Sequence, residues 1–165
     1  MPMKKTNVEK LLDNKDLPRI VEVVDPKAIK IYGGTKMLIA PPMYYYEIMK
    51  KIPEGQLITS DRIRGYLAKI NEADYTCPLT AGIFINIVAG AAMEDQEYYI
   101  PYYRTLKKEG QLNEKFPGGI EYQKALLELE GHKIIKKGNK YYVADYQFKL
   151  YDLDNKSESI LVIDQ

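Results

Sequence analysis

The stretch Ile100-Pro101-Tyr102-Tyr103-Arg104 follows the most apolar run of the chain and precedes a segment rich in turn-forming residues. It contains neither cysteine nor histidine, so no reactive thiol stands at this point of the sequence. The run before it, residues 79–93, has the composition of a largely buried helix. After it, Gly110 and Pro117-Gly118-Gly119 indicate turns, and residues 120–129 predict another helix. The pentapeptide is therefore expected in the connection between two helices.

Two more helices are expected upstream, over residues 43–51 and 59–70, with Ile52-Pro53-Glu54-Gly55 breaking the pattern between them. Downstream, Gly138-Asn139 stands between two short apolar segments, which is typical of a tight hairpin. Residues 160–163 are all apolar and are expected either to dock on the sheet as a strand or to form a loosely held end.

The N-terminal third predicts a small strand-containing piece. Residues 6–14 have the spacing of a short helix that begins with a capping residue. Residues 19–24 and 28–32 are expected to be extended on either side of an Asp-Pro turn, and residues 37–40 to form a short strand.

Composition is that of a soluble globular protein, with 45% hydrophobic and 28% charged residues. No run of about 18 apolar residues occurs, so we expect no membrane span. The polar, charged beginning of the chain favours a cytoplasmic protein. The lone Cys77 excludes an internal disulfide, and the lone His132 argues against a zinc site or a serine-histidine triad. We therefore expect neither a metal nor another cofactor.

Charge is distributed unevenly although the net charge is only +1. Residues 101–140 hold nine Lys or Arg and five Asp or Glu, whereas residues 141–165 hold two basic and five acidic residues. A nearly neutral protein can still present a basic face to a nucleic acid. The alternative is that scattered charges only solvate the surface, and charge alone favours that alternative.

Five motifs occur in an order that matches a known family. They are Ile52-Pro53-Glu54-Gly55-Gln56-Leu57-Ile58-Thr59, Pro78-Leu79-Thr80-Ala81-Gly82, Ile100-Pro101-Tyr102-Tyr103-Arg104, Gly110 with Pro117-Gly118-Gly119, and Leu126-Leu127-Glu128-Leu129-Glu130-Gly131-His132. With them, residues 43–138 resemble the C-terminal domain of the alkylguanine-DNA alkyltransferases and the alkyltransferase-like proteins. The N-terminal piece and the tail gain nothing from this resemblance.

The resemblance implies an α/β or α+β fold whose core is a winged helix-turn-helix. It divides the chain into an N-terminal strand-containing piece (1–42), an alkyltransferase-like domain (43–138) and a C-terminal strand with an acidic tail (139–165). Members of this family approach the minor groove of DNA and turn the damaged base out of the duplex into a pocket, at a cost of about a few kcal/mol. In the enzymes of the family, a cysteine thiolate in that pocket then takes the alkyl group.

This chain departs from the enzymes at the residues that carry the chemistry. Tyr102 stands where the family has its cysteine, and Tyr103 where it has its histidine. Leu79 aligns with the intercalating arginine, Ser60 with the tyrosine that helps to turn the base out, and Glu130 matches the family's glutamate. Alkyltransferase-like proteins carry tryptophan at the cysteine position, bind alkylated DNA without repairing it, and pass it to other repair proteins. Tyr102, an aromatic residue at that position, makes this chain resemble them more than the enzymes.

We therefore predict a methyltransferase homologue that is not an enzyme, with double-stranded DNA, including alkylated DNA, as its partner and repair proteins as further partners. The implied sites form two groups. The DNA-binding candidates are Ser60, Arg62, Arg64, Leu79 and Thr80. The base-pocket candidates are Tyr102, Tyr103, Arg104, Gly118, Gly119 and Glu130.

Each assignment has a plainer structural alternative. Tyr102 and Tyr103 can be core aromatics, and a salt bridge to Glu130 is the favoured interpretation of Arg104. Packing against the preceding helix is favoured for Leu79. Two other functions also stay open at this point. One is a degenerate scaffold reused as a small-molecule or protein-binding module, which the near-neutral charge favours; the other is an alkyltransferase acting through Cys77.

Overall fold

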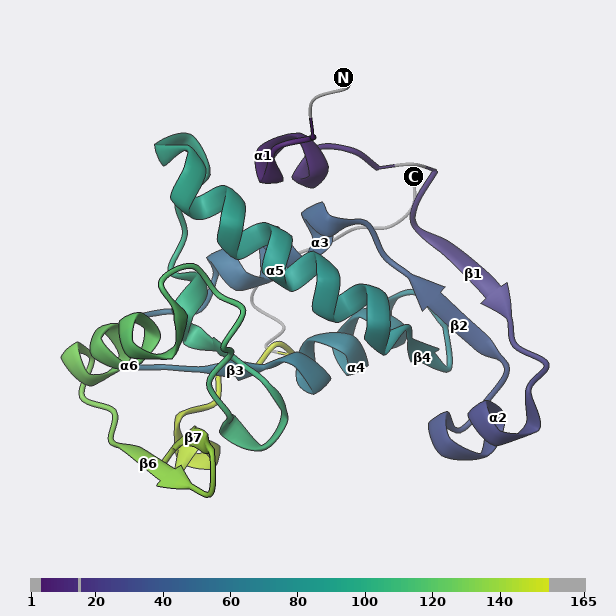
Figure 1. Cartoon of the computed structure of the whole chain (residues 1–165). Helices are drawn as coiled ribbons and strands as arrows, with labels where there is room; N and C mark the ends of the chain where they lie inside the picture. Colours follow the sequence, from purple (N-terminus) through teal and green to yellow (C-terminus); the bar gives the residue numbers. More distant parts are fainter. Residues whose placement is uncertain (1–3, 15, 155–165) are drawn as a thin grey trace.

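The longest helix, α5 (Pro78–Glu94), runs diagonally through the middle of the molecule, and most of the other helices pack around it (Figure 1). This computed structural model describes residues 4–14 and 16–154. The other helices are α1 (Asn7–Leu11), α2 (Pro26–Tyr32), α3 (Pro42–Lys50), α4 (Ser60–Ile70) and α6 (Gly119–Leu129). Helices and short strands mix along the chain, so the predicted α+β class is confirmed.

Within the described residues, the strands form three small sheets. Their bounds are β1 (Arg19–Glu22), β2 (Lys36–Ile39), β3 (Ile58–Thr59), β4 (Tyr75–Thr76), β5 (Thr105–Leu106), β6 (Ile134–Lys137) and β7 (Lys140–Val143). β2 pairs antiparallel with β1 and parallel with β4. β3 and β5 pair in parallel, and β6 and β7 form an antiparallel hairpin around the predicted turn at Gly138.

One hydrophobic core joins residues from the N-terminal piece, the middle of the chain and the C-terminal part of the described residues. It includes Leu11 and Leu38 from the N-terminal piece, the buried face of α5, and Leu153 near the C-terminal end of the described residues. β2 also shares its sheet with β4, which lies inside the predicted domain of residues 43–138. The division at residues 42 and 138 stays a prediction; in the structure, the pieces on either side share a core.

The helix at the N-terminus and the C-terminal hairpin form where the sequence predicts them. Thr6 caps α1 and takes part in a capping box with Glu9, since the side chain of each accepts a hydrogen bond from the backbone N–H of the other. The predicted apolar strand at 160–163 lies outside the described residues. Among the described residues, no helix has the length and apolar character needed to cross a membrane.

The expectation that residues 28–32 are extended is wrong, because they belong to helix α2. The Asp25-Pro26 pair is the start of this helix and not a turn between strands. The Asp25 carboxylate accepts a hydrogen bond from the Lys27 N–H at 3.2 Å, and Pro26 occupies the first helical position, where its fixed φ and missing N–H do no harm. Gly33, with φ 84°, ends the helix in the left-handed region.

Candidate nucleic-acid interface

Glu130, the residue that ends α6, binds two separate segments of the chain. Its carboxylate accepts hydrogen bonds from Arg104 Nη2 at 2.7 Å, from the Tyr103 hydroxyl at 2.6 Å and from the Gly55 N–H at 3.0 Å. Arg104 in turn donates from Nη1 to the Ile52 carbonyl at 2.7 Å. We call Gly55, Tyr103, Arg104 and Glu130 the Glu130 cluster; it fastens the Ile-Pro-Glu-Gly loop and the Pro-Tyr-Tyr-Arg segment to the end of α6.

The Glu130 cluster is nearly closed to solvent, since the side chains of Arg104 and Glu130 are only 12% and 7% exposed. Burial alone raises the pKa of Glu130, but the hydrogen bonds from Arg104, Tyr103 and Gly55 outweigh it and hold that pKa below 4.5. Burial, together with the hydrogen bond to Glu130, raises the pKa of Tyr103 above its ordinary value. An ionised carboxylate, a guanidinium and a neutral phenol therefore coexist here at neutral pH, and the favoured Arg104–Glu130 salt bridge is confirmed.

Tyr102 is completely buried in the core. Its ring makes edge contacts with Phe116 at 5.3 Å and with Tyr103 at 5.9 Å between centroids. Its hydroxyl has no hydrogen-bond partner within residues 4–14 and 16–154, and burial raises its pKa to about 12. The structure therefore places both tyrosines of the motif inside the protein, which is the plainer of their two interpretations. Their role in a base pocket stays a prediction.

The predicted glycine turn forms at the start of α6. Gly118 and Gly119 have φ angles of 83° and 70°, a region that favours glycine. A Cβ at Gly118 would lie 2.6 Å from that of Tyr122, so this position also excludes larger residues for lack of space. After this turn, α6 runs next to the Pro-Tyr-Tyr-Arg segment, and Gln123 of the helix donates a hydrogen bond to the Tyr103 carbonyl.

Gln123 is the structural residue of this region that sequence reasoning missed. It is 1% exposed, and its Nε2 donates to the carbonyls of Tyr103 at 3.0 Å and Thr105 at 3.3 Å. Its Oε1 accepts from the Asn113 N–H at 2.8 Å. The available signal was its spacing: Gln123 lies four residues before the buried Leu127 and thus on the buried face of α6.

An open groove of about 400 Å³ lies beside the Glu130 cluster, between the first half of α5, the start of α4 and residues 105–115. We call it the α5 groove. Ile85 and Leu106 are the buried apolar residues of its lining, and Thr105 adds a buried hydroxyl that has no partner in the described part of the chain. A pair of side-chain amides also lines it, with Asn113 Nδ2 donating to Asn86 Oδ1 at 3.0 Å.

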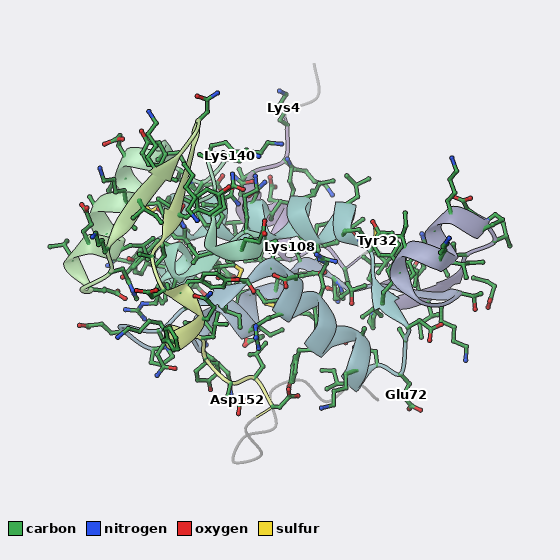
Figure 2. The ribbon with its side chains drawn as sticks, turned by 90° about the horizontal axis from the view of Figure 1, so that it is seen from below. Lys4, Tyr32, Glu72, Lys108, Lys140 and Asp152 are labelled. Carbon is green, nitrogen blue, oxygen red and sulfur yellow. The ribbon has the colours of Figure 1, made fainter. Side chains whose placement is uncertain are left out.

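The α5 groove also carries charge. Its lining includes Lys107, Lys108, Lys115 and Glu114. Lys107 pairs with Glu114 at 3.3 Å, and within residues 4–14 and 16–154 it is the only one of these lysines that forms an ion pair. In the view from below, Lys108 lies near the centre of the molecule (Figure 2). Apolar contact area, hydrogen-bonding groups and an excess of positive charge thus meet in one hollow.

The structure divides the predicted DNA-binding residues between different surfaces. Ser60 and Leu79 line the α5 groove. Leu79 is 71% exposed, so the favoured interpretation that it packs against the preceding helix is wrong; as the second residue of α5 it projects outward. Arg62 and Arg64 instead line two other hollows along α4. Thr80 is partly buried, and its hydroxyl points back to the Cys77 carbonyl at 3.5 Å.

No protein-family model matches this sequence, and no curated protein matches it. Solved structures do. One is the crystal structure of Atl1 from S. pombe in complex with damaged DNA containing O6-carboxymethylguanine; it is 20% identical, with a TM-score of 0.50, over 67% of this chain and 94% of that chain. Another, of the S. pombe ATL in complex with DNA, is 18% identical, covers the same shares and has a TM-score of 0.48. The first likeness confirms the resemblance in fold: this chain has an alkyltransferase-like scaffold.

Proposed function

We propose that this chain binds double-stranded DNA and holds a base that has been turned out of the duplex in the α5 groove, without transferring an alkyl group. The observation that carries the proposal is the groove itself, which joins an apolar surface, hydrogen-bonding side chains and lysines at the start of α5. The S. pombe protein of the same fold, solved with damaged DNA, supports the choice of DNA as the ligand.

The groove has a group for each part of a nucleotide. Ile85 and Leu106 offer apolar contact to the face of a base, while the Thr105 hydroxyl and the Asn86–Asn113 amides offer hydrogen bonds to its edge. The lysines suit the phosphates, which supply affinity without sequence preference. Leu79, exposed at the groove, has the apolar character of the wedges that minor-groove binders insert between base pairs.

Alkyl transfer needs a nucleophile in the groove, and the residues at the family's reactive positions are unsuited to it. Tyr102 is enclosed in the core as a neutral phenol, and the Tyr103 hydroxyl is engaged by Glu130. Cys77 precedes α5 as its capping residue, and it does not belong to the groove lining. A protein that recognises a lesion without repairing it requires a repair protein to act afterwards, so we propose such a protein as a further partner.

Two glycines offer a direct test of the α5 groove. Gly82 in α5 lines the groove, whereas Gly65 in α4 lines the two hollows along that helix. A Cβ at either position meets no atom within 4 Å, and neither glycine has a positive φ. Tryptophan at Gly82 should fill the groove, while tryptophan at Gly65 should add the same bulk elsewhere without strain.

The measurement is fluorescence anisotropy with two duplexes that differ only by O6-methylguanine in place of guanine, at several salt concentrations. We expect the unmodified protein and Gly65→Trp to prefer the alkylated duplex. For Gly82→Trp, the ratio of the two dissociation constants should fall at least about tenfold, which corresponds to about 1.4 kcal/mol. Equal binding of the unmodified protein to both duplexes removes damage recognition, and absence of binding to either removes the DNA-binding function. Binding of free nucleotides without any duplex binding supports the small-molecule alternative.

A further inference from the structure

Helix α2 keeps its shape although it buries no side chain. A seven-residue helix is unstable by itself in water, so something outside the core must hold it. The caps at both ends do so, together with Tyr32, whose ring stacks on Tyr75 at 4.6 Å with an interplanar angle of 12°. A helix that is stabilised by its caps and by one stacked ring, and that adds no buried side chain to the core, is well suited to present its outer surface to a partner.

This helix belongs to an arm, formed by β1, α2 and β2, that projects to one side of the molecule (Figure 1). The arm is fastened next to the start of α5, because β2 pairs with β4 and the Cys77 N–H donates to the Leu38 carbonyl at 2.9 Å. Leu79, which lines the groove, is only four positions after Tyr75, which stacks on Tyr32 of α2. Fully extended, four residues reach about 14 Å. The arm and the α5 groove are therefore neighbours.

The outward surface of α2 is basic. Helical spacing places Lys27, Lys30 and Ile31 on one face, and all three are exposed. Neither lysine forms an ion pair with another residue of the described ranges 4–14 and 16–154. Residues 19–36 hold four Lys or Arg and two Asp or Glu, and one of the two acids, Asp25, is engaged in capping α2. The free positive charge on this face complements a phosphate backbone.

We propose that the arm is a second DNA contact, in which Lys27 and Lys30 bind phosphates of the duplex on one side of the base held in the α5 groove. This inference rests on the proposed function and adds to it on which side of the held base the protein contacts the duplex. Figure 2 shows α2 at one end of the molecule and the β6–β7 hairpin at the other, with Lys108 between them. The arm therefore lies on one side of the α5 groove and can contact only the part of the duplex that extends to that side.

The test compares Lys27→Ala/Lys30→Ala with a control, Lys10→Ala/Lys50→Ala, which removes the same charge from exposed positions of α1 and α3. Two duplexes carry O6-methylguanine near one end, so that one extends only to its 5′ side and the other only to its 3′ side. We expect the slope of log Kd against log salt to fall by about 1.8 for the α2 variant on one of the duplexes, since each phosphate contact contributes about 0.9. The other duplex and the control variant should show no change in slope.

The outcomes separate this inference from the proposed function. If the unmodified protein binds the duplexes and the α2 variant changes both slopes equally or neither, the arm contact is overturned and the groove proposal stands. If the unmodified protein binds no duplex, both fail, and an acidic protein becomes the better partner for α2. Because α2 buries no side chain, thermal unfolding should show that both double variants are folded. A smaller salt slope then reports a lost phosphate contact and not misfolding.

Discussion

The Glu130 cluster and the α5 groove meet along one stretch of chain, residues 103–108, yet the cluster is closed to solvent and the groove is open. Tyr103 and Arg104 are held by the Glu130 carboxylate, whereas Thr105 to Lys108 line the groove. In the alkyltransferase family, the positions of Tyr102 and Tyr103 carry the chemistry. Here both tyrosines are buried, and the residues that follow them line the groove in which we propose that a base is held. Substitutions in the closed cluster should therefore change the free energy of unfolding more than substitutions at the open groove.

The largest loss is expected for Glu130→Gln, which keeps the size of the side chain and removes its charge. Breaking a buried ion pair by removing one partner costs about 3–5 kcal/mol, because the other charge stays buried. Lys69→Ala, which removes the exposed Lys69–Asp154 pair, should cost at most about 1 kcal/mol. Urea unfolding of both variants measures the difference. Equal losses of unfolding free energy would contradict the larger contribution that we expect from the buried Glu130 cluster.

The two tyrosines of the motif should respond in opposite ways when their hydroxyls are removed. Tyr103→Phe loses a hydrogen bond to a charged acceptor and should cost about 1.5–3 kcal/mol. Tyr102→Phe removes a buried hydroxyl that has no partner in the described residues, so stability should stay the same or rise. Since the substitutions are identical and adjacent, each serves as the control for the other. A loss at Tyr102 as large as that at Tyr103 would show that its hydroxyl has a partner after all.

Acid should lower the free energy of unfolding partly through Glu130. The expected loss is smaller than that for Glu130→Gln or Tyr103→Phe. The pKa of Glu130 is lowered in the folded state, so as pH falls below 4.5 the unfolded chain takes up this proton first. The stability that Glu130 contributes is therefore present above pH 4.5 and is lost as pH falls through its folded pKa. Unfolding free energies measured from pH 6 to 3 should fall less steeply for Glu130→Gln; an unchanged slope would contradict the lowered pKa.

A small gain in stability is expected for Gly82→Ala. Alanine in a helix interior is more stable than glycine by about 0.5–1 kcal/mol, and the space around Gly82 is open. Gly65→Ala should give the same gain on α4. Thermal unfolding measures both. A loss at Gly82 alone would mean that the α5 groove is more tightly packed than its open lining indicates.

The smallest effect on stability is expected for Leu79→Ala, at most about 0.5 kcal/mol, because the side chain is 71% exposed. Its effect on DNA binding should be clear, since the substitution removes the apolar side chain beside the groove. Anisotropy with the alkylated duplex should show weaker binding, and Leu129→Ala, which removes the same side chain from an exposed position of α6, provides a matched apolar control. A large loss of stability would return Leu79 to a packing role.

Local signals in the sequence were enough for most of the fold. The helices α3 to α6, the glycine turn before α6 and the β6–β7 hairpin all lie where spacing and turn residues predict them. The α2 helix was missed because Asp25-Pro26 suits a turn as well as a helix start, and only the structure decides between them. Propensity separates such cases poorly when the segment buries nothing.

The candidate site was harder to predict because its contacts join distant parts of the chain. Glu130 matched the family's glutamate, but nothing local indicates that it binds Gly55, which lies 75 residues earlier. The α5 groove was missed for the same reason: Asn113 and Lys115 belong to no recognised motif and reach the groove only through the fold. Sequence reasoning thus pointed to Tyr102 and Tyr103, which are buried, and not to the next residues of the same loop, which line the groove.

The long separation between Gly55 and Glu130 also has a consequence for how the protein is made. All residues that line the α5 groove lie between positions 60 and 115, so a ribosome delivers them before it adds Glu130. A growing chain can therefore begin to assemble the groove while the carboxylate that fastens Tyr103 and Arg104 is still missing. Contacts of such long separation form slowly. We expect the closing of this cluster to be among the last steps by which a newly synthesised chain becomes rigid.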